Sequence, residues 1–320
     1  MSNLSKALRQ TRESAAMVSP VPVAGPTLKA DGSSRFAGSL LRSRTSVLFR
    51  HLPLALTGDE EAIHQLRVSG RRLRVALPLL TAKPDGRRVA RAKRLLRQLT
   101  RLAGSSRDLD VLLASYDERL KELTSRTPEQ QILRHRLTDA RRRSRGRMVD
   151  GLLDLEISRL RGDLSGLVRR GGPAPSIVCE RFASTSAREL HALGEELKKI
   201  GPRLDAQELH AFRRRARRLR YAIEVFDEIR NFKSTASKPW KTLQDLIGVI
   251  HDHQVLAEWF DAQAKNDDRH GKGALAAAAR EEATWAISTM HRLHAQFLAA
   301  NPTALVAQGL AALGQSHHPE

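Results

Sequence analysis

Two arginine-rich segments have the residue pattern with the clearest chemical meaning. Residues 64–77 read HQLRVSGRRLRVAL, and residues 210–223 read HAFRRRARRLRYAI. At 3.6 residues per turn, a helix through each segment gathers one histidine and three arginines into a single stripe. The first stripe holds His64, Arg67, Arg71 and Arg74, and the second holds His210, Arg213, Arg217 and Arg220. Because guanidinium stays charged and forms two-pronged hydrogen bonds to phosphate oxygens, the stripes predict binding of a phosphate-rich polyanion.

The alternative interpretation is that each stripe is a solvated helix face, with arginine stems packed on the protein and their head groups in water. Stacked like charges destabilise an isolated helix by about 0.2–0.5 kcal/mol per pair, and few acidic residues interrupt these stripes. We favour a binding surface because the stripe occurs twice, with a histidine at the same place. A structural role for His64 and His210, as hydrogen-bond partners of a neighbouring helix, stays open.

The stripes belong to a longer internal repeat. An offset of 146 residues, which carries His64 onto His210, also carries Arg42 onto Arg188 and Asp59 onto Asp205. After an adjustment of two residues the correspondence continues with four further pairs: Arg97 and Lys241, Gly104 and Gly248, Arg107 and His251, and Asp108 and Asp252. Chance matching in an arginine-rich chain explains the arginines but not the ordered histidine, glycine and aspartate pairs. We infer that the chain contains two copies of one helical unit.

Further basic residues extend the candidate binding surface. Arg72 and Arg218 stand beside the stripes, and Lys93 and Arg97 share one face of the helix that follows the first stripe. Lys241 takes the place of Arg97 in the second copy, and Arg42 and Arg188 lie on the first helix of each copy. We expect all of these residues to contribute to one basic surface.

Nothing in the sequence predicts a reacting group. There is no GxxxxGK[ST] or GxSxG motif, and Asp108 and Asp252 are expected to cap helices or pair with a stripe arginine. The single cysteine, Cys179, excludes zinc sites that need two or more cysteines, and no HExxH spacing is present. His251 with His253, and His291 with His294, could each supply two metal ligands, but we do not expect a metal site at either pair. We therefore expect a binding protein without metal or cofactor, and not an enzyme.

The composition favours an all-helical protein with an anionic partner. The chain has 320 residues, of which 41% are hydrophobic and only 4% aromatic, and the hydrophobic residues are mostly Leu and Ala. Lys and Arg outnumber Asp and Glu by 55 to 35, which gives a formal net charge of +20. Such a surplus fits nucleic acid, an acidic membrane surface or another polyanion. No stretch of about 18 apolar residues is present, so no membrane-spanning helix is expected.

Pro- and Gly-rich stretches divide the helical pattern. We expect the first helix from Arg35 to a break at Pro53, a second from Asp59, and breaks at Gly104, at Gly146 or Gly151, and between Ile250 and Asp252. The predicted organisation is a disordered tail over 1–34, helical halves over 35–168 and 177–300 joined by a linker over 169–176, and a tail over 301–320. The alternative for that last tail is a short docked helix carrying Leu305 and Val306.

These residues support a family resemblance. The run His64-Gln-Leu-Arg67-Val-Ser-Gly-Arg71-Arg72-Leu-Arg74, followed by Leu102-Ala-Gly104-Ser-Ser-Arg107-Asp108-Leu-Asp110-Val111, resembles the CHAD domain, the conserved histidine α-helical domain. His210 to Tyr221 with Glu224, Gly248 and Asp252 is similar to that family's C-terminal half. The resemblance covers residues 35–300. The two copies differ at two of these positions. Pro78 stands where the second copy has Glu224, and His251 stands where the first copy has Arg107. The two halves therefore need not contact a ligand equally.

The resemblance implies two helical bundles of about four or five helices each, related by a pseudo-twofold axis. It implies a basic central surface that binds inorganic polyphosphate, and association with polyphosphate granules, and with granule proteins, in the cytoplasm of bacterial cells. Some members carry a triphosphate-cleaving CYTH domain marked by an ExExK motif, which this sequence lacks, so we expect a stand-alone CHAD protein. Nonspecific nucleic-acid binding through the same arginines is the alternative function, although few aromatic residues are present to stack on bases.

Overall fold

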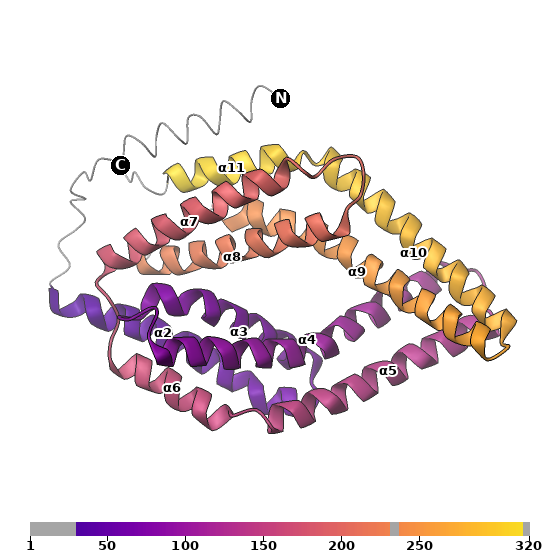
Figure 1. Ribbon diagram of the computed structural model, residues 1–320, viewed down its shortest axis with the longest axis horizontal. Helices are drawn as coiled ribbons and strands as arrows, with labels where there is room; N and C mark the ends of the chain where they lie inside the picture. The colour runs from indigo at the N-terminus through magenta and orange to yellow at the C-terminus, as the bar shows by residue number, and fades with distance from the viewer. Residues whose placement is uncertain (1–29, 231–236, 316–320) are drawn as a thin grey trace.

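The described part of the molecule is built from helices alone. The computed structural model describes residues 30–230 and 237–315, and no strand occurs in these ranges, which confirms the all-α class. Figure 1 shows an elongated arrangement in which α7 and α8 lie along one long side and α3, α4 and α6 along the other. The helices are α2 (Ala30–Leu56), α3 (Glu60–Leu80), α4 (Arg87–Glu122), α5 (Pro128–Leu153), α6 (Ile157–Arg169), α7 (Pro175–Leu197), α8 (Ala206–Arg230), α9 (Ser237–Arg269), α10 (Gly273–Ala299) and α11 (Pro302–Gln315).

The two helices that carry the arginine stripes begin at equivalent aspartates. Asp59 accepts a hydrogen bond from the backbone N–H of Ala62 at 2.7 Å at the start of α3. Asp205 accepts hydrogen bonds from Gln207 N and Glu208 N at 2.8 and 3.0 Å at the start of α8. Each carboxylate satisfies helix N–H groups that have no partner within the helix. The pairing of Asp59 with Asp205 in the sequence repeat therefore corresponds to the same local structure.

Two breaks expected from the sequence are absent. Helix α4 continues without interruption through Gly104 to Glu122, and α9 continues through Ile250 and Asp252 to Arg269. The predicted caps at Gly104, Asp108 and Asp252 are therefore wrong, because all three residues lie inside helices. A glycine inside a helix costs about 1 kcal/mol relative to alanine, which packing along a long helix offsets.

Other element boundaries also differ from the expectation. Helix α2 begins at Ala30, inside the predicted tail, and continues past Pro53 to Leu56. The break after α5 falls at residues 154–156 and not at Gly146 or Gly151. Residues 302–315 form α11, whose Val306 is buried in the core, so the docked helix replaces the loose tail there. Residues 1–29 and 316–320 of the predicted tails lie outside the described residues.

The hydrophobic side chains form two clusters, and both draw on the two predicted halves. The larger cluster includes Leu66 and Leu73 of α3, Phe212 and Leu219 of α8, and Trp240 of α9. The smaller one lies where α4 and α5 meet α9 and α10, at the narrow end of the molecule in Figure 1, and includes Tyr116, Leu133, Phe260 and Ala283. The halves consequently share their cores, which holds α3 and α8 in a fixed relation.

A tight connection and an interhelical cap join the halves behind this core. Between α6 and α7, Gly171 has a φ of +71°, and a Cβ on Gly172 would lie 2.4 Å from the Cβ of Ala37. Only glycine fits such a position. Arg181 of α7 donates to the carbonyl oxygen of Thr81 at 2.7 Å and to that of Pro78 at 3.3 Å, at the end of α3. An arginine of the second half therefore satisfies carbonyl groups left free at a helix end of the first.

Candidate anion-binding surface

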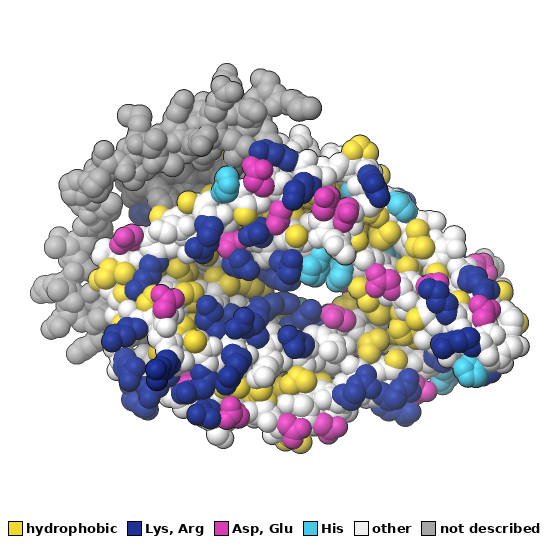
Figure 2. Space-filling view, viewed as in Figure 1, with side chains coloured by type: hydrophobic (Ala, Val, Ile, Leu, Met, Phe, Trp, Pro, Cys, Tyr) yellow, Lys and Arg dark blue, Asp and Glu magenta, His cyan; other side chains and the backbone are white. Residues whose placement is uncertain are grey.

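The two arginine stripes meet between α3 and α8. Figure 2 shows a hollow in the middle of the molecule, with Lys and Arg side chains along both of its sides and His side chains at one end. Across this region Arg213 of α8 interacts electrostatically with Arg67 of α3, and Arg217 interacts with Arg71. Helices 146 residues apart in the sequence thus bring their guanidinium groups together. We call the five residues Arg67, Arg71, Arg74, Arg213 and Arg217 the central surface.

Three members of the central surface have no carboxylate partner. Among the described residues, no ion pair involves Arg71, Arg74 or Arg217. The strongest electrostatic influences on them come from other arginines and from Tyr221. Most other buried or half-buried arginines are neutralised, as Arg91 is by Asp163 at 2.5 Å and Arg136 by Asp267 at 2.6 Å. The centre of the molecule therefore concentrates positive charge that the protein itself leaves uncompensated.

Burial makes this charge costly. Burial, followed by the charge of neighbouring Arg71, lowers the pKa of Arg217 to about 9. Burial also lowers the pKa of Arg71, and the charge of Arg67 lowers it further. Burial likewise lowers the pKa of Arg74, and the charge of Arg97 adds to that effect. All three guanidinium groups remain protonated at neutral pH. A bound anion would offset the mutual repulsion and the cost of burying these charges.

The remaining predicted arginines of α3 and α8 are paired within the protein. Arg72 of α3 lies 2.9 Å from Glu224 of α8, and Arg220 lies 3.9 Å from the same carboxylate. Their guanidinium groups also flank the ring of Tyr221, at 5.7 and 5.0 Å from its centroid. Arg218 lies 2.7 Å from Glu189, whose side chain is only 1% exposed. Arg72 thus links α3 to α8, and Arg218 links α8 to α7, whereas Arg220 is paired within α8. All three have less charge to offer a ligand.

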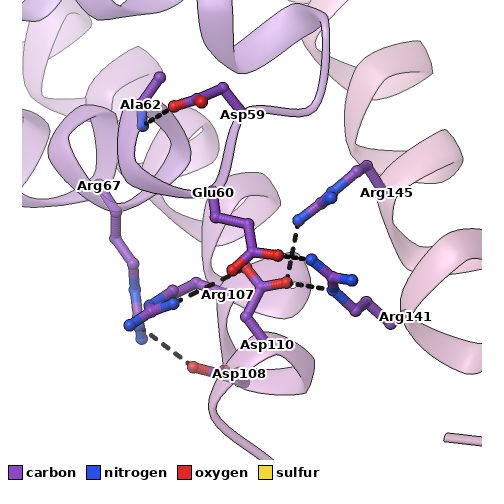
Figure 3. A network of polar contacts seen from close by, with 9 residues as sticks. All are labelled: Asp59, Glu60, Ala62, Arg67, Arg107, Asp108, Asp110, Arg141 and Arg145. Atoms are coloured by element: carbon purple, nitrogen blue, oxygen red, sulfur yellow. Dashed lines mark hydrogen bonds and ion pairs between the residues drawn. The ribbon is translucent and has the colours of Figure 1, made fainter. Parts of the chain in front are cut away.

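One edge of the central surface is anchored by a network of carboxylates, drawn in Figure 3. Arg67 pairs with Asp108 of α4 at 3.2 Å, which confirms the pairing alternative for that aspartate. Nearby, the buried carboxylate of Asp110 binds Arg141 at 2.7 Å and Arg145 at 2.9 Å, both from α5, with Arg107 at 3.9 Å. Arg141 also pairs with Glu60, so α3, α4 and α5 are fixed to one another beside the stripe.

The second copy repeats the local arrangement around Arg67. A Cβ on Gly104 would lie 3.5 Å from Nε of Arg67, and a Cβ on Gly248 would lie 3.1 Å from a terminal nitrogen of Arg213. Arg67 and Arg213 therefore lie against equivalent helical glycines, Gly104 and Gly248. Asp252, the counterpart of Asp108, is the carboxylate that acts most strongly on Arg213. These contacts support the inferred duplication, and the pseudo-twofold axis itself stays a prediction.

Comparison with known proteins agrees with this geometry. The family model for the CHAD domain matches residues 39–261. The chain belongs to the CHAD family. The crystal structure of the CHAD domain from the plant Ricinus communis has a TM-score of 0.63 at 22% identity, covering 87% of this chain and 91% of that one. PptA from Streptomyces chartreusis has a TM-score of 0.55 at 16% identity, covering 82% of this chain and 99% of that one. No curated protein matches the sequence.

The histidines of this CHAD chain border its arginines. Burial, then the charge of Arg107, lowers the pKa of His64. Burial, then the neighbouring His251, lowers the pKa of His210 to about 4, and the two rings lie 5.1 Å apart. Both stripe histidines are consequently neutral at pH 7. They are half-buried, and the positive charge around them disfavours protonation.

Several predicted residues lie outside the central surface of the CHAD fold. Arg97 acts on Arg74 and borders the surface, whereas Lys241 pairs with Asp245 at 2.6 Å. Arg188 is exposed on α7 and Lys93 half-buried on α4, and neither is among the groups that most strongly influence Arg71, Arg74, Arg213 or Arg217. Arg42 faces α6 instead, in a groove with Arg161 and Arg169. Equivalence in the repeat therefore did not ensure a place on one shared surface.

Three residues that the predicted set omitted belong with the site. Arg107 acts on His64, and His251 lies beside His210, so each stripe histidine has a basic or histidine neighbour from the next long helix. The internal repeat already paired Arg107 with His251, which was the signal that could have added both. Tyr221 is buried, and it raises the pKa of Arg71, Arg213 and Arg217 against the lowering effect of burial. Helical spacing alone does not reveal this role.

The described residues contain neither a metal-binding cluster nor a membrane-spanning helix. In residues 30–230 and 237–315, no three His, Cys, Asp or Glu side chains gather closely enough to hold a metal ion. No helix in the same ranges is both long and apolar enough to cross a membrane.

Proposed function

We propose that this CHAD chain binds inorganic polyphosphate along the central surface. The observation that carries the proposal is the meeting of Arg71, Arg74 and Arg217 without any carboxylate partner among the described residues. Inorganic polyphosphate supplies a negative charge at every unit and no other recognition feature. A surface of unpaired guanidinium groups matches that chemistry.

The extent of the surface favours a chain over a single phosphate. From Arg67 to Arg74 the stripe advances seven residues along α3, which is about 10 Å of helix at 1.5 Å per residue. Arg213 and Arg217 provide a parallel set from α8. A long anion contacts both helices at once, and linked contacts add affinity through effective concentration.

Nucleic acid fits the surface less well. Single strands are held by bases stacked on exposed aromatic rings. Tyr221 is the aromatic residue among the arginines, but it is 2% exposed and its ring is flanked by Arg72 and Arg220. Duplex DNA, which binds through phosphates without base readout, remains the relevant competitor.

A binding titration tests the proposal. Labelled long-chain polyphosphate is titrated with the protein at two salt concentrations, with excess duplex DNA as competitor. We expect binding that weakens with salt and resists DNA, and that is lost in the variant R71A/R74A/R217A. A control variant, R142A/R203A/K272A, removes three exposed charges elsewhere and should bind normally. Equal binding by both variants would contradict the proposal.

We further propose that the protein binds polyphosphate without cleaving it, and that it associates with polyphosphate granules in the cytoplasm. The lack of a known catalytic motif in the sequence supports the first point. Phosphate release above a blank without protein, abolished in R71A/R74A/R217A, would refute it. For the second point, a fluorescent fusion should colocalise with granules in cells, and the fusion of R71A/R74A/R217A should be diffuse.

A further inference from the structure

A second basic groove lies between α2 and α6. Phe49 of α2 contacts Arg161 near the start of α6, and Gly38 of α2 lies beside Val168 near its end, so the helices run antiparallel. The groove is lined by Arg42, Ser46 and Phe49 from α2 and by Arg161, Ser165 and Arg169 from α6. Figure 2 shows Lys and Arg side chains gathered over the part of the molecule where α6 lies. Each helix contributes an arginine followed four residues later by a serine, which places the two side chains on one face.

The three arginines of this groove have no internal partner. Within residues 30–230 and 237–315, no ion pair or hydrogen bond to a carboxylate involves Arg42, Arg161 or Arg169. No acidic residue lines the groove, because Asp163 of α6 points instead to Arg91 of α4 and is 4% exposed. Other charges of α6 are matched, as Arg159 is by Glu156 at 2.9 Å. All three groove arginines are exposed, and the two from α6, Arg161 and Arg169, lie on its side toward α2.

The groove also provides fixed and free hydrogen-bond donors. The guanidinium of Arg161 lies over the ring of Phe49, 4.5 Å from its centroid, which restrains its position. The hydroxyl groups of Ser46 and Ser165 have no hydrogen-bond partner in the described part of the chain. Guanidinium and hydroxyl groups together are typical donors to phosphate oxygens.

This groove is separate from the central surface. Arg44, two residues after Arg42, turns the other way and pairs with Glu228 of α8 at 2.6 Å. Successive helical residues are about 100° apart, so Arg42 and Arg44 lie on opposite sides of α2. A ligand in the groove consequently does not touch Arg71 or Arg217.

We propose that the α2–α6 groove is a second binding site, specific for a short anion with several phosphate groups, such as tripolyphosphate. Arg161 and Arg169 are eight residues apart, about 12 Å along the helix, which suits an elongated anion better than orthophosphate. The groove presents little apolar surface: Phe49 and Val168, which line it, are partly buried, and none of the exposed large hydrophobic side chains is among its lining residues. A soluble phosphate chain is therefore favoured over a lipid head group, whose surface would be matched by exposed apolar side chains.

The test uses the full chain carrying R71A/R74A/R217A, which removes the three unpaired arginines of the central surface so that binding in the groove can be measured against a lowered background. In this background, tripolyphosphate should still bind, more tightly than orthophosphate. Adding R42Q/R161Q/R169Q should weaken tripolyphosphate binding by at least about tenfold, since several charge-assisted hydrogen bonds are lost. Adding R142Q/R203Q/K272Q, which removes the same charge from exposed sites elsewhere, should leave binding within about twofold. Circular dichroism and thermal unfolding establish that every variant is folded.

Three outcomes would overturn the proposal: no tripolyphosphate binding in the R71A/R74A/R217A background, equal loss in the groove and control variants, or groove-dependent binding to phosphatidylglycerol vesicles with no effect on tripolyphosphate. The last outcome would assign the groove to a lipid surface. The proposal does not depend on the function of the central surface. Long-chain binding by a protein carrying only R42Q/R161Q/R169Q tests the central surface separately, so failure of either site is recognised independently.

Discussion

Arg217 of α8 and Arg71 of α3 lie close enough for the charge of Arg71 to be the strongest electrostatic influence on Arg217. Burial and this like charge both lower the pKa of Arg217, while the Tyr221 hydroxyl, which also acts on Arg71, opposes the effect. Within the described ranges, neither arginine forms an ion pair with a carboxylate, and no carboxylate is among the strongest influences on either. Two helices are therefore packed so that like charges face each other, an arrangement that the proposed anionic ligand would stabilise.

Replacing the unpaired arginines should separate binding from folding. In R71A/R74A/R217A we expect polyphosphate affinity to fall by about 1.5–3 kcal/mol for each charge-assisted hydrogen bond lost where the site is desolvated. The stability should be unchanged or higher, because alanine is the better helix former and repulsion is removed. Binding titrations and thermal unfolding of the same samples measure both effects.

The paired arginines of the same helices provide the matched control. In R72A/R218A/R220A the carboxylates of Glu224 and Glu189 lose partners, and the Glu189 side chain is 1% exposed. We expect this variant to lose about 1–3 kcal/mol of stability, since a buried charge is left less well satisfied. Its affinity, corrected for the folded fraction, should fall less than that of R71A/R74A/R217A. The reverse ranking would show that the ion-paired arginines form the binding surface.

Polyphosphate binding should strengthen as the pH falls. Burial, the neighbouring His251 and the arginines around it hold the pKa of His210 near 4, below its ordinary value of 6.5. A bound polyanion favours the protonated ring and raises this pKa, so the complex takes up protons. We expect affinity to rise between pH 7.5 and pH 5.5, with less change in H210Q/H251Q. A pH-independent affinity of the wild type, or an unaltered slope in this variant, would contradict the prediction.

The free protein should respond to acid in the opposite direction. Because the pKa of His210, His251 and His64 is lowered in the folded state, the unfolded chain binds more protons between the folded and unfolded pKa values. Stability is therefore fully present above about pH 6.5 and declines toward pH 4. Chemical denaturation at pH 7 and pH 5, without and with polyphosphate, should show that the ligand offsets this loss.

Alanine substitution of two helical glycines should have effects of opposite sign. At Gly104 a Cβ would meet only Arg67 atoms at 3.5 Å or more, so G104A should stabilise the protein by up to about 1 kcal/mol through helix propensity. At Gly70 a Cβ would lie 2.6 Å from the Cγ2 of Thr100, so G70A should destabilise it. Urea denaturation distinguishes the two. A destabilised G104A would mean that α4 does not continue through this position as a regular helix.

Chain length should matter at the central surface. A long polyphosphate chain reaches the arginines of α3 and α8 together, whereas a short one satisfies fewer of them. In R42Q/R161Q/R169Q, which removes the second groove, we expect long chains to bind far more tightly per molecule than tripolyphosphate. Competition of labelled long chains by each unlabelled ligand measures the ratio. Equal affinities would rule out a surface shared by the two helices.

The internal repeat predicted more of the site than the motif residues did. It paired Arg107 with His251 before either had a role, and both lie beside the stripe histidines. It also paired Arg42 with Arg188, yet Arg42 faces α6. An offset in the sequence identifies equivalent positions, but it does not state which side of a helix a neighbouring element covers.

The sequence alone determined the helical class, the start of α3 at Asp59, its equivalence to Asp205 and the composition of each stripe, because these depend on local residue patterns. Only the tertiary structure decided which arginines stay unpaired. Arg72 and Arg71 are adjacent in the chain, but Arg72 meets Glu224 of α8, whereas Arg71 meets arginines and Tyr221. The partner in each case comes from a helix about 150 residues away, and the 100° turn between successive helical residues sends the two side chains to different neighbours.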